Sequence, residues 1–289
     1  MKKSTRIWLI VAVCLIIAGV AIMAGGLSFG GFDLEKMTTQ EIETVTYESD
    51  ETVTDILVNT ITADVAFVPS EDENVIVVYQ NEEKLKHSVQ VEGSTLVIEA
   101  QDTRKWMDYI GINFHTPAVT IYLPAGEYDD LQIHTDTGHV TMPADFSFQN
   151  AQLELSTGKT LWRAHVVREL DIQCSTGNVT LEDTSCGSLH VQATTGDVTL
   201  TRTSSLGTLE VKTNTGDVKL EKVDGGEIDI ETTTGNVTGT LCTDKVFNTK
   251  TATGKITTPS GKELVPGQKP SNKCTVSTDT GDIHLEIAN

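Results

Sequence analysis

The stretch CSTGNVTL, residues 174–181, has two close copies, ATTGDVTL at 193–200 and TNTGDVKL at 213–220. The Thr-Gly pair inside it occurs eight times, and successive glycines are 20, 19, 19, 20, 19, 19 and 27 residues apart. A catalytic motif normally occurs once, whereas a phrase that returns at a fixed interval is typical of a repeat architecture. We therefore expect a structural role for the pairs, which are Thr137, Gly138, Thr157, Gly158, Thr176, Gly177, Thr195, Gly196, Thr215, Gly216, Thr234, Gly235, Thr253, Gly254, Thr280 and Gly281.

Each copy alternates apolar and polar residues on both sides of its glycine. Seven and five places before Gly177 stand Leu170 and Ile172, and the residues between and after them are polar in every copy. Such alternation is typical of a strand with one buried face. Beyond the glycine the apolar residues, Val179 and Leu181, lie at even offsets, so the alternation has slipped by one. Because Gly can adopt a positive φ, this slip predicts a corner between two strands that face the same core.

Threonine often stands both three places and one place before the glycine, as in Thr213 and Thr215. Both positions share the alternation of the apolar columns, so we predict that both side chains point inward. Stacked threonines that hydrogen-bond near a corner are then a better interpretation than an exposed ice-binding array.

A single unit of 19 or 20 residues has nothing against which to bury its apolar face, so the units must stack. The sequence therefore predicts an all-β fold, a single-stranded parallel β-solenoid with rungs of 19–20 residues. Eight rungs would form a column about 35 to 40 Å tall. A degenerate copy at 56–67, with Ala63 in place of Gly, indicates that the solenoid domain spans 51–289. We expect a less regular entry region at 51–130, with strands at 75–79, 89–100 and 118–124, and the regular repeats at 131–289.

The amino-terminal segment has the composition of a membrane anchor. Three positive charges within residues 1–6 precede an uncharged apolar run that starts at Ile7, and no charged residue follows until Asp33. The run is long enough to cross a hydrocarbon layer about 30 Å thick, although cleavage as a signal peptide near Ala24 is the alternative. The positive residues predict a cytoplasmic tail at 1–6, a single transmembrane helix at 7–25, a linker at 26–50 and an extracytoplasmic body in the cell membrane.

The charge of the chain excludes one class of partner. It carries 41 acidic and 21 basic residues, a formal net charge of −20. A body of this charge repels phosphate backbones, so nucleic-acid binding is not expected. Cations or basic partners would be attracted, and a simple soluble polar coat is the other interpretation.

The segment VTIYLPAGEYDDLQIHTDTGHVTM, residues 119–142, leads directly into the first Thr-Gly copy. Together with the array, it resembles the bacterial putative-adhesin family of β-strand-repeat proteins, a domain of unknown function whose members include LiaG-like membrane-anchored envelope proteins. The resemblance covers about residues 51–289. It implies a parallel, right-handed β-solenoid and supplies no catalytic residues.

Metal and enzyme chemistry find little support in the sequence. TTGDV is superficially similar to the turns of calcium solenoids, but the column after the glycine contains Lys159 and Lys255, where a cation ladder needs carboxylates. The acidic residues lie in outward columns, and no nucleophile elbow or phosphate loop is present. We therefore predict no catalytic residue, no metal site and no cofactor. Four histidines near strands, His134, His139, His190 and His284, are interpreted as surface residues.

The stretch KWMDYIGINFH, residues 105–115, is the one irregular segment rich in aromatic residues. It either covers the side or the open end of the solenoid, or forms a contact patch for a partner or the membrane surface. The candidate contact residues are Trp106, Met107, Tyr109, Ile110 and Phe114.

Four cysteines lie in the predicted extracytoplasmic body, where disulfides are permitted. Their spacings match no metal site, and the sequence leaves open whether they are paired. They are Cys174, Cys186, Cys242 and Cys274.

These features together predict a membrane-anchored, extracytoplasmic, non-catalytic β-solenoid that serves as an adhesin or as an envelope binding or sensing scaffold. Its partners would be the membrane, through residues 7–25, and an envelope protein or glycan. Two alternatives remain open at this point, a carbohydrate-active β-helix enzyme and an accessory component of a membrane stress-response system.

Overall fold

The computed structural model describes residues 42–104, 116–259 and 272–288. Within these ranges the chain forms 22 strands and no helix, which confirms the all-β prediction. No helix able to span a membrane occurs in the described ranges. The predicted tail and anchor at 1–25, and the aromatic segment 105–115, lie outside them.

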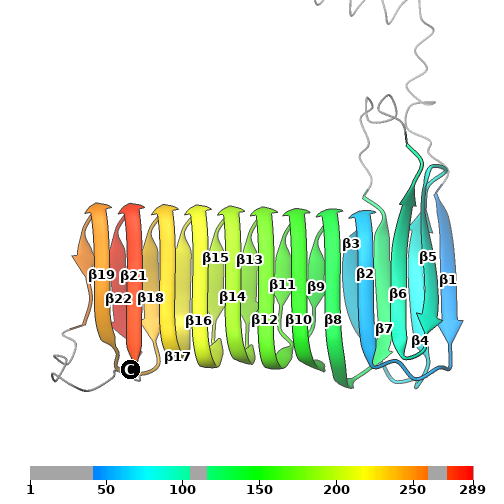
Figure 1. Ribbon diagram of the computed structural model, residues 1–289, viewed down its shortest axis with the longest axis horizontal. Coiled ribbons are helices and arrows are strands. Elements are labelled where there is room, and N and C mark those ends of the chain that lie inside the picture. The colour runs from blue at the N-terminus through cyan, green and yellow to red at the C-terminus, as the bar shows by residue number, and fades with distance from the viewer. Residues whose placement is uncertain (1–41, 105–115, 260–271, 289) are drawn as a thin grey trace, which may run out of the picture. The chain divides into compact units, whose positions relative to one another are not determined.

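The strands form two facing sheets, and each regular rung contributes one strand to each sheet (Figure 1). The long-strand sheet contains, in spatial order, β5 (Leu85–Glu92), β6 (Thr95–Asp102), β2 (Asp55–Thr62), β8 (Gly126–Thr137), β10 (Phe146–Thr157), β12 (His165–Thr176), β14 (Ser185–Thr195), β16 (Ser204–Thr215), the second half of β17 (Val218–Thr234), β21 (Lys273–Thr280) and β19 (Val246–Thr253).

The short-strand sheet has the matching order. It contains β1 (Glu43–Ser49), β4 (Val75–Asn81), β7 (Ala118–Pro124), β3 (Asp64–Ser70), β9 (Val140–Met142), β11 (Thr160–Trp162), β13 (Val179–Glu182), β15 (Val198–Thr201), the first half of β17, β18 (Val237–Leu241), β22 (Ile283–Ile287) and β20 (Ile256–Thr257).

The predicted apolar columns fill the space between the two sheets. Leu170 and Ile172 on β12 and Val179 and Leu181 on β13 are completely buried, and the equivalent residues of the neighbouring copies lie directly above and below them. Stacking thus supplies the apolar contacts that no single rung has by itself.

The glycine of each Thr-Gly pair sits at a corner where successive rungs touch through their backbones. A Cβ built on Gly196 would lie 1.9 Å from the carbonyl oxygen of Gly177 in the preceding rung. The N–H of Gly196 donates to the carbonyl of Thr215 in the following rung at 2.9 Å. The repeat therefore keeps Gly at this corner because any side chain would separate the rungs.

The threonine prediction is correct for one column and wrong for the other. Three places before the glycine, Thr213 is buried and its Oγ1 donates to the carbonyl of Gly196 at 3.4 Å. One place before the glycine, Thr215 is exposed, as are its equivalents in the regular copies. The strand bends before it reaches the corner, so the two positions before Gly both face solvent.

The column after the glycine holds the rungs together through side-chain acceptors. Asn178 Oδ1 accepts the N–H of Asp197 at 3.1 Å, Asp197 Oδ1 accepts that of Asp217 at 2.9 Å, and Asp217 Oδ1 accepts that of Asn236 at 2.8 Å. None of these residues has a positive φ. Asn and Asp are therefore used here as inter-rung hydrogen-bond acceptors rather than for unusual backbone angles.

The second corner, which follows the short strand, is formed by residues other than glycine in three rungs. The chain turns at Asp183, Arg202 and Lys222, which have φ of 51°, 47° and 53°. Gly187 and Gly207 instead fall where the register of the following long strands shifts, so they belong to β-bulges.

The rungs do not follow sequence order at the carboxyl end. The last copy, β21 and β22, is inserted between β17–β18 and the preceding copy, β19–β20 (Figure 1). The buried Lys245 holds this arrangement, because its Nζ donates to Asp224 Oδ1 at 2.7 Å, to the carbonyl of Gly225 at 2.7 Å and to Asn272 Oδ1 at 2.5 Å. The predicted stacking of the units therefore holds for this pair, but their order in space differs from their order in the sequence.

The amino-terminal end departs from a purely parallel stack as well. The degenerate copy, β2 and β3, packs directly on the first regular rung, and the later rung of β6 and β7 lies on its other side. Beyond it, β1, β4 and β5 pair antiparallel with their neighbours. Residues 43–49, assigned to the linker 26–50, form β1, because Val45 and Tyr47 alternate with polar residues and pack against the core.

We predict that Gly196→Ala destabilises the protein by about 3 kcal/mol or more, because the new Cβ would overlap the Gly177 carbonyl. Urea unfolding measures the change. Gly126→Ala is the control, since Gly126 has a φ of +159° and no atom within 4 Å of the position of its Cβ. Equal losses for the two variants would contradict the role of the backbone contact.

We predict that Asp217→Asn leaves stability nearly unchanged, whereas Asp217→Ala lowers it by about 1 kcal/mol. Asn keeps an oxygen that can accept the N–H of Asn236, and Ala does not. Thermal unfolding with and without added calcium would test both variants. A loss for Asn as large as that for Ala would show that the charge of Asp217 matters, as a bound cation would require.

Candidate functional site

The residues predicted for partner contact fall outside the part of the chain that the structure describes. Trp106, Met107, Tyr109, Ile110 and Phe114 all belong to the segment 105–115. The Thr-Gly pairs build the corner of the stack. A candidate site must therefore be sought on the outer faces of the two sheets.

The outer face of the long-strand sheet has a polar hollow of about 240 Å³ over β8, β10, β12 and β14. We call it the polar trough. Its outward-facing side chains are His134, Glu154, Ser156, Gln173, Ser175, Gln192 and Thr194, and Leu155 and Cys174 also line it.

The strand register arranges these side chains in two columns. His134, Glu154, Gln173 and Gln192 are aligned four places before the glycine on successive strands. The second column, two places before the glycine, consists of the smaller Ser156, Ser175 and Thr194. Neighbouring strands lie about 4.8 Å apart, so equivalent groups recur at that interval along the stack. The shallow hollow arises because the short side chains of the second column leave space beside the long side chains of the first column.

Most groups of the trough are free to bind a ligand. The side chains of Ser156, Ser175, Gln192 and Thr194 make no hydrogen bond to any residue that the structure describes. Gln173 donates from Nε2 to Asp171 at 3.1 Å and keeps its amide oxygen open. Hydroxyls and amides offer both donors and acceptors. The trough therefore presents uncommitted hydrogen-bonding groups in a regular array.

One carboxylate, that of Glu154, lies in the trough, and each of its oxygens has a neighbouring polar partner. Glu154 Oε1 accepts a hydrogen bond from Gln152 Nε2 at 3.1 Å. Its Oε2 lies 3.4 Å from His134 Nδ1, and both side chains are about half exposed. Glu154 is thus the single carboxylate among the lining residues of the trough, within a strongly acidic protein.

A second hollow of about 250 Å³ lies beside the trough on the same sheet. Its polar lining consists of Asp130, Gln132, Asn150, Gln152, Glu169 and Asp171. Asn150 Nδ2 donates to Asp130 Oδ1 at 2.7 Å, so amides engage part of this carboxylate cluster. Among the described residues, no group of three or more His, Cys, Asp or Glu side chains is arranged to hold a metal ion.

A larger hollow of about 390 Å³ lies at the amino-terminal end of the stack. Asp50, Glu51, Glu73 and Glu127 surround it, and Tyr128 lines it with its hydroxyl already donating to the carbonyl of Pro124 at 2.8 Å. Burial raises the pKa of Tyr128 to about 12, so it stays protonated. The excess of carboxylates would repel anionic ligands there.

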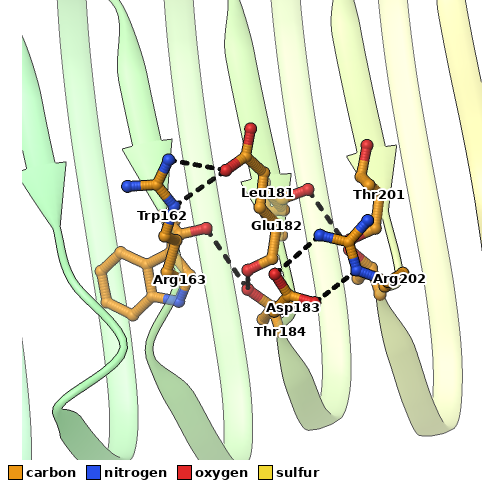
Figure 2. Close-up of polar contacts among 9 residues, drawn as sticks. Trp162, Arg163, Leu181, Glu182, Asp183, Thr184, Thr201 and Arg202 are labelled. Atoms are coloured by element: carbon orange, nitrogen blue, oxygen red, sulfur yellow. Dashed lines mark hydrogen bonds and ion pairs between the residues drawn. The ribbon is translucent and has the colours of Figure 1, made fainter.

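Charged side chains at the second corner are paired across rungs, in contrast to the trough. Figure 2 shows Arg163 reaching Glu182 and Arg202 reaching Asp183, with the closest nitrogen–oxygen distances 2.7 and 2.5 Å. The hydrogen bond from Arg202 lowers the pKa of Asp183. The hydroxyl of Thr184 donates to the carbonyl of Trp162 at 3.4 Å (Figure 2). These groups stabilise one rung on the next.

The same pairing flanks the trough on the long-strand sheet. Glu210 accepts hydrogen bonds from Lys212 and from His190, whose Nδ1 lies 2.9 Å from Oε2. These two partners, Lys212 first, lower the pKa of Glu210. The trough therefore ends where paired charges begin.

The four cysteines are free thiols in the structure, and three of them are buried. Burial raises the pKa of Cys186 to about 11 and that of Cys274 to about 12. The pKa of Cys174, which lines the trough, is raised by burial too. These thiols are therefore protonated near neutral pH and poor nucleophiles.

The alternation in the sequence predicts polar residues between the apolar columns, but it does not predict a hollow. A signal was nevertheless present, because Ser156, Ser175 and Thr194 follow one another two places before the glycine in three consecutive copies. Short residues in register beside a column of long ones leave a hollow.

Solved structures of bacterial proteins share this fold. The chain resembles a Bacteroides fragilis protein described as a putative adhesin, with a TM-score of 0.52 and 13% identity over 84% of this chain and 97% of that one. Two Parabacteroides distasonis proteins cover 86% of this chain and 98% of theirs, a putative adhesin with a TM-score of 0.40 and 10% identity and a putative lipid binding protein with 0.37 and 12%.

No curated protein matches the chain. The family model described as Toastrack DUF4097 matches residues 53–287, which include nearly the whole described stack. The two-sheet stack of rungs and this match agree, and the chain belongs to the Toastrack DUF4097 family.

Proposed function

We propose that the protein is a non-catalytic β-solenoid scaffold, anchored in the cell membrane by residues 7–25, that binds an envelope component outside the cytoplasm. The observation that carries this proposal is the polar trough, a rigid array of uncommitted side chains on the outer face of the long-strand sheet. Rigidity matters because ligand groups then meet preformed positions, and little conformational entropy is lost on binding.

The adhesin-like character of the scaffold is supported by its likeness in fold to the Bacteroides fragilis protein described as a putative adhesin. A scaffold of this kind needs a surface of fixed geometry and no reacting groups. The thiols buried among the rungs and the carboxylates bonded to neighbouring amides agree with a binding role. A role as an accessory of a membrane stress-response system would use the same body and the same anchor.

The anchor and its orientation can be tested with tags at the two ends of the chain. We predict that protease added to cells with permeabilised outer layers removes a carboxyl-terminal tag and leaves an amino-terminal tag protected. The charge pattern of residues 1–6 gives this orientation. Protection of both tags until the membrane is lysed would contradict the extracytoplasmic location.

The binding face can be tested with matched charge insertions on the two sheets. We predict that Ser175→Lys with Thr194→Lys lowers binding of the full-length chain to isolated envelope material at least tenfold, because two long cations would fill the trough. Thr180→Lys with Thr199→Lys on β13 and β15 is the control, since it adds the same charge to the short-strand sheet. Equal binding by both variants would exclude the trough as the binding face.

A further inference from the structure

The geometry points to an uncharged, hydroxyl-rich polysaccharide as the ligand of the polar trough, lying along the stack axis across β8, β10, β12 and β14. This assignment rests on the proposed binding function and goes beyond it by naming the ligand class and its direction. It is argued from the chemistry of the lining, its periodicity and its charge.

The lining matches sugar hydroxyls better than it matches ions. The amides of Gln173 and Gln192 and the hydroxyls of Ser156, Ser175 and Thr194 can each donate and accept hydrogen bonds. A sugar hydroxyl has the same double capacity. An anion would need a surplus of donors or positive charge, and a cation would need open carboxylates.

The charge of the trough separates it from the two other hollows. Glu154 is its single carboxylate, and it lies beside His134 and accepts from Gln152. The neighbouring hollow has Asp130, Glu169 and Asp171 among its lining residues, and the hollow at the amino-terminal end has four carboxylates. Basic ligands would therefore gather in those hollows, and the trough is left for a neutral molecule.

The periodicity of the trough sets the direction of the ligand. Like groups recur on consecutive strands about 4.8 Å apart, so the four strands cover about 14 Å along the stack. A chain of repeating units can place hydroxyls against successive strands in this direction. A ligand lying parallel to the strands would meet each column only once.

The lining also predicts how affinity is distributed. The trough has no Trp, Tyr or Phe among its lining residues, so it lacks the large rings that stack on sugars. Single sugars should bind weakly, and affinity should come from several units bound at once, as in other multivalent contacts. Dependence on ligand length is thus the main signature of the proposed arrangement.

The test measures binding of the purified full-length chain to neutral gluco-oligosaccharides of increasing length, with polylysine and polyglutamate as charged probes. We expect affinity to rise until the oligosaccharide covers about 14 Å and then to level off. We also expect little change between low and high salt, because no ion pairs form. Tighter binding of either charged probe, lost at high salt, would overturn the assignment of a neutral ligand.

Two variants separate hydrogen bonding from charge. Gln173→Ala with Gln192→Ala should weaken oligosaccharide binding about 10-fold or more, since two amides are lost. Glu231→Gln on β17 removes an exposed carboxylate of the same sheet outside the trough and should leave binding within about twofold. Asn248→Ala on β19 removes an exposed amide of the same sheet outside the trough and is the matched control. Unfolding temperatures equal to that of the parent chain show that the variants are folded.

The outcomes also distinguish this assignment from the proposed function. If the lysine insertions at Ser175 and Thr194 abolish envelope binding while no neutral oligosaccharide binds, the trough is a binding face for another ligand and the polysaccharide assignment is wrong. If those insertions leave envelope binding intact, the trough is not the face that binds the envelope, and the proposed function of the trough is wrong. Oligosaccharide binding that the paired glutamine variant does not weaken would also overturn the assignment.

Discussion

The backbone contact between corner glycines is the constraint on which the rest of the stack depends. Each corner brings the carbonyl oxygen of one glycine to the place where the next glycine would carry its Cβ, within 2.0 Å for Gly216 on Gly196 and for Gly281 on Gly235. No other residue type allows this approach. Because the corners are in contact, the strands before and after them are also in register. Equivalent side chains of successive rungs therefore lie above one another.

Register converts single residues into columns, and the columns have distinct tasks. Apolar columns fill the space between the sheets, and inward threonines bond to glycine carbonyls of the preceding rung. Asn and Asp after the glycine accept backbone N–H groups of the next rung. Paired charges at the second corner add contacts on the outside. The polar trough differs because most of its side chains form no contact that holds one rung on the next.

The freedom of the trough residues is what makes a binding function reasonable. A repeat protein can vary, with little loss of stability, those outward columns that carry neither the core nor the inter-rung hydrogen bonds. In the trough these positions hold amides and hydroxyls, whereas on the next rung Lys212 and Glu210 pair with each other. Function in this protein is therefore a property of a face built from four rungs and of no single residue.

The sequence by itself determined the strands, the corners and the inward columns, because alternation and glycine position act locally and recur in every copy. It did not determine the order of β21–β22 and β19–β20, since both copies offer the same edge to β17 and β18, and the contacts of Lys245 with Asp224 and Asn272 appear only when the chain has folded. The exposed threonine beside each glycine and the hollow of the trough were likewise decided by tertiary structure. Both depend on how a strand bends and on which side chains become neighbours, and strand alternation alone contains neither.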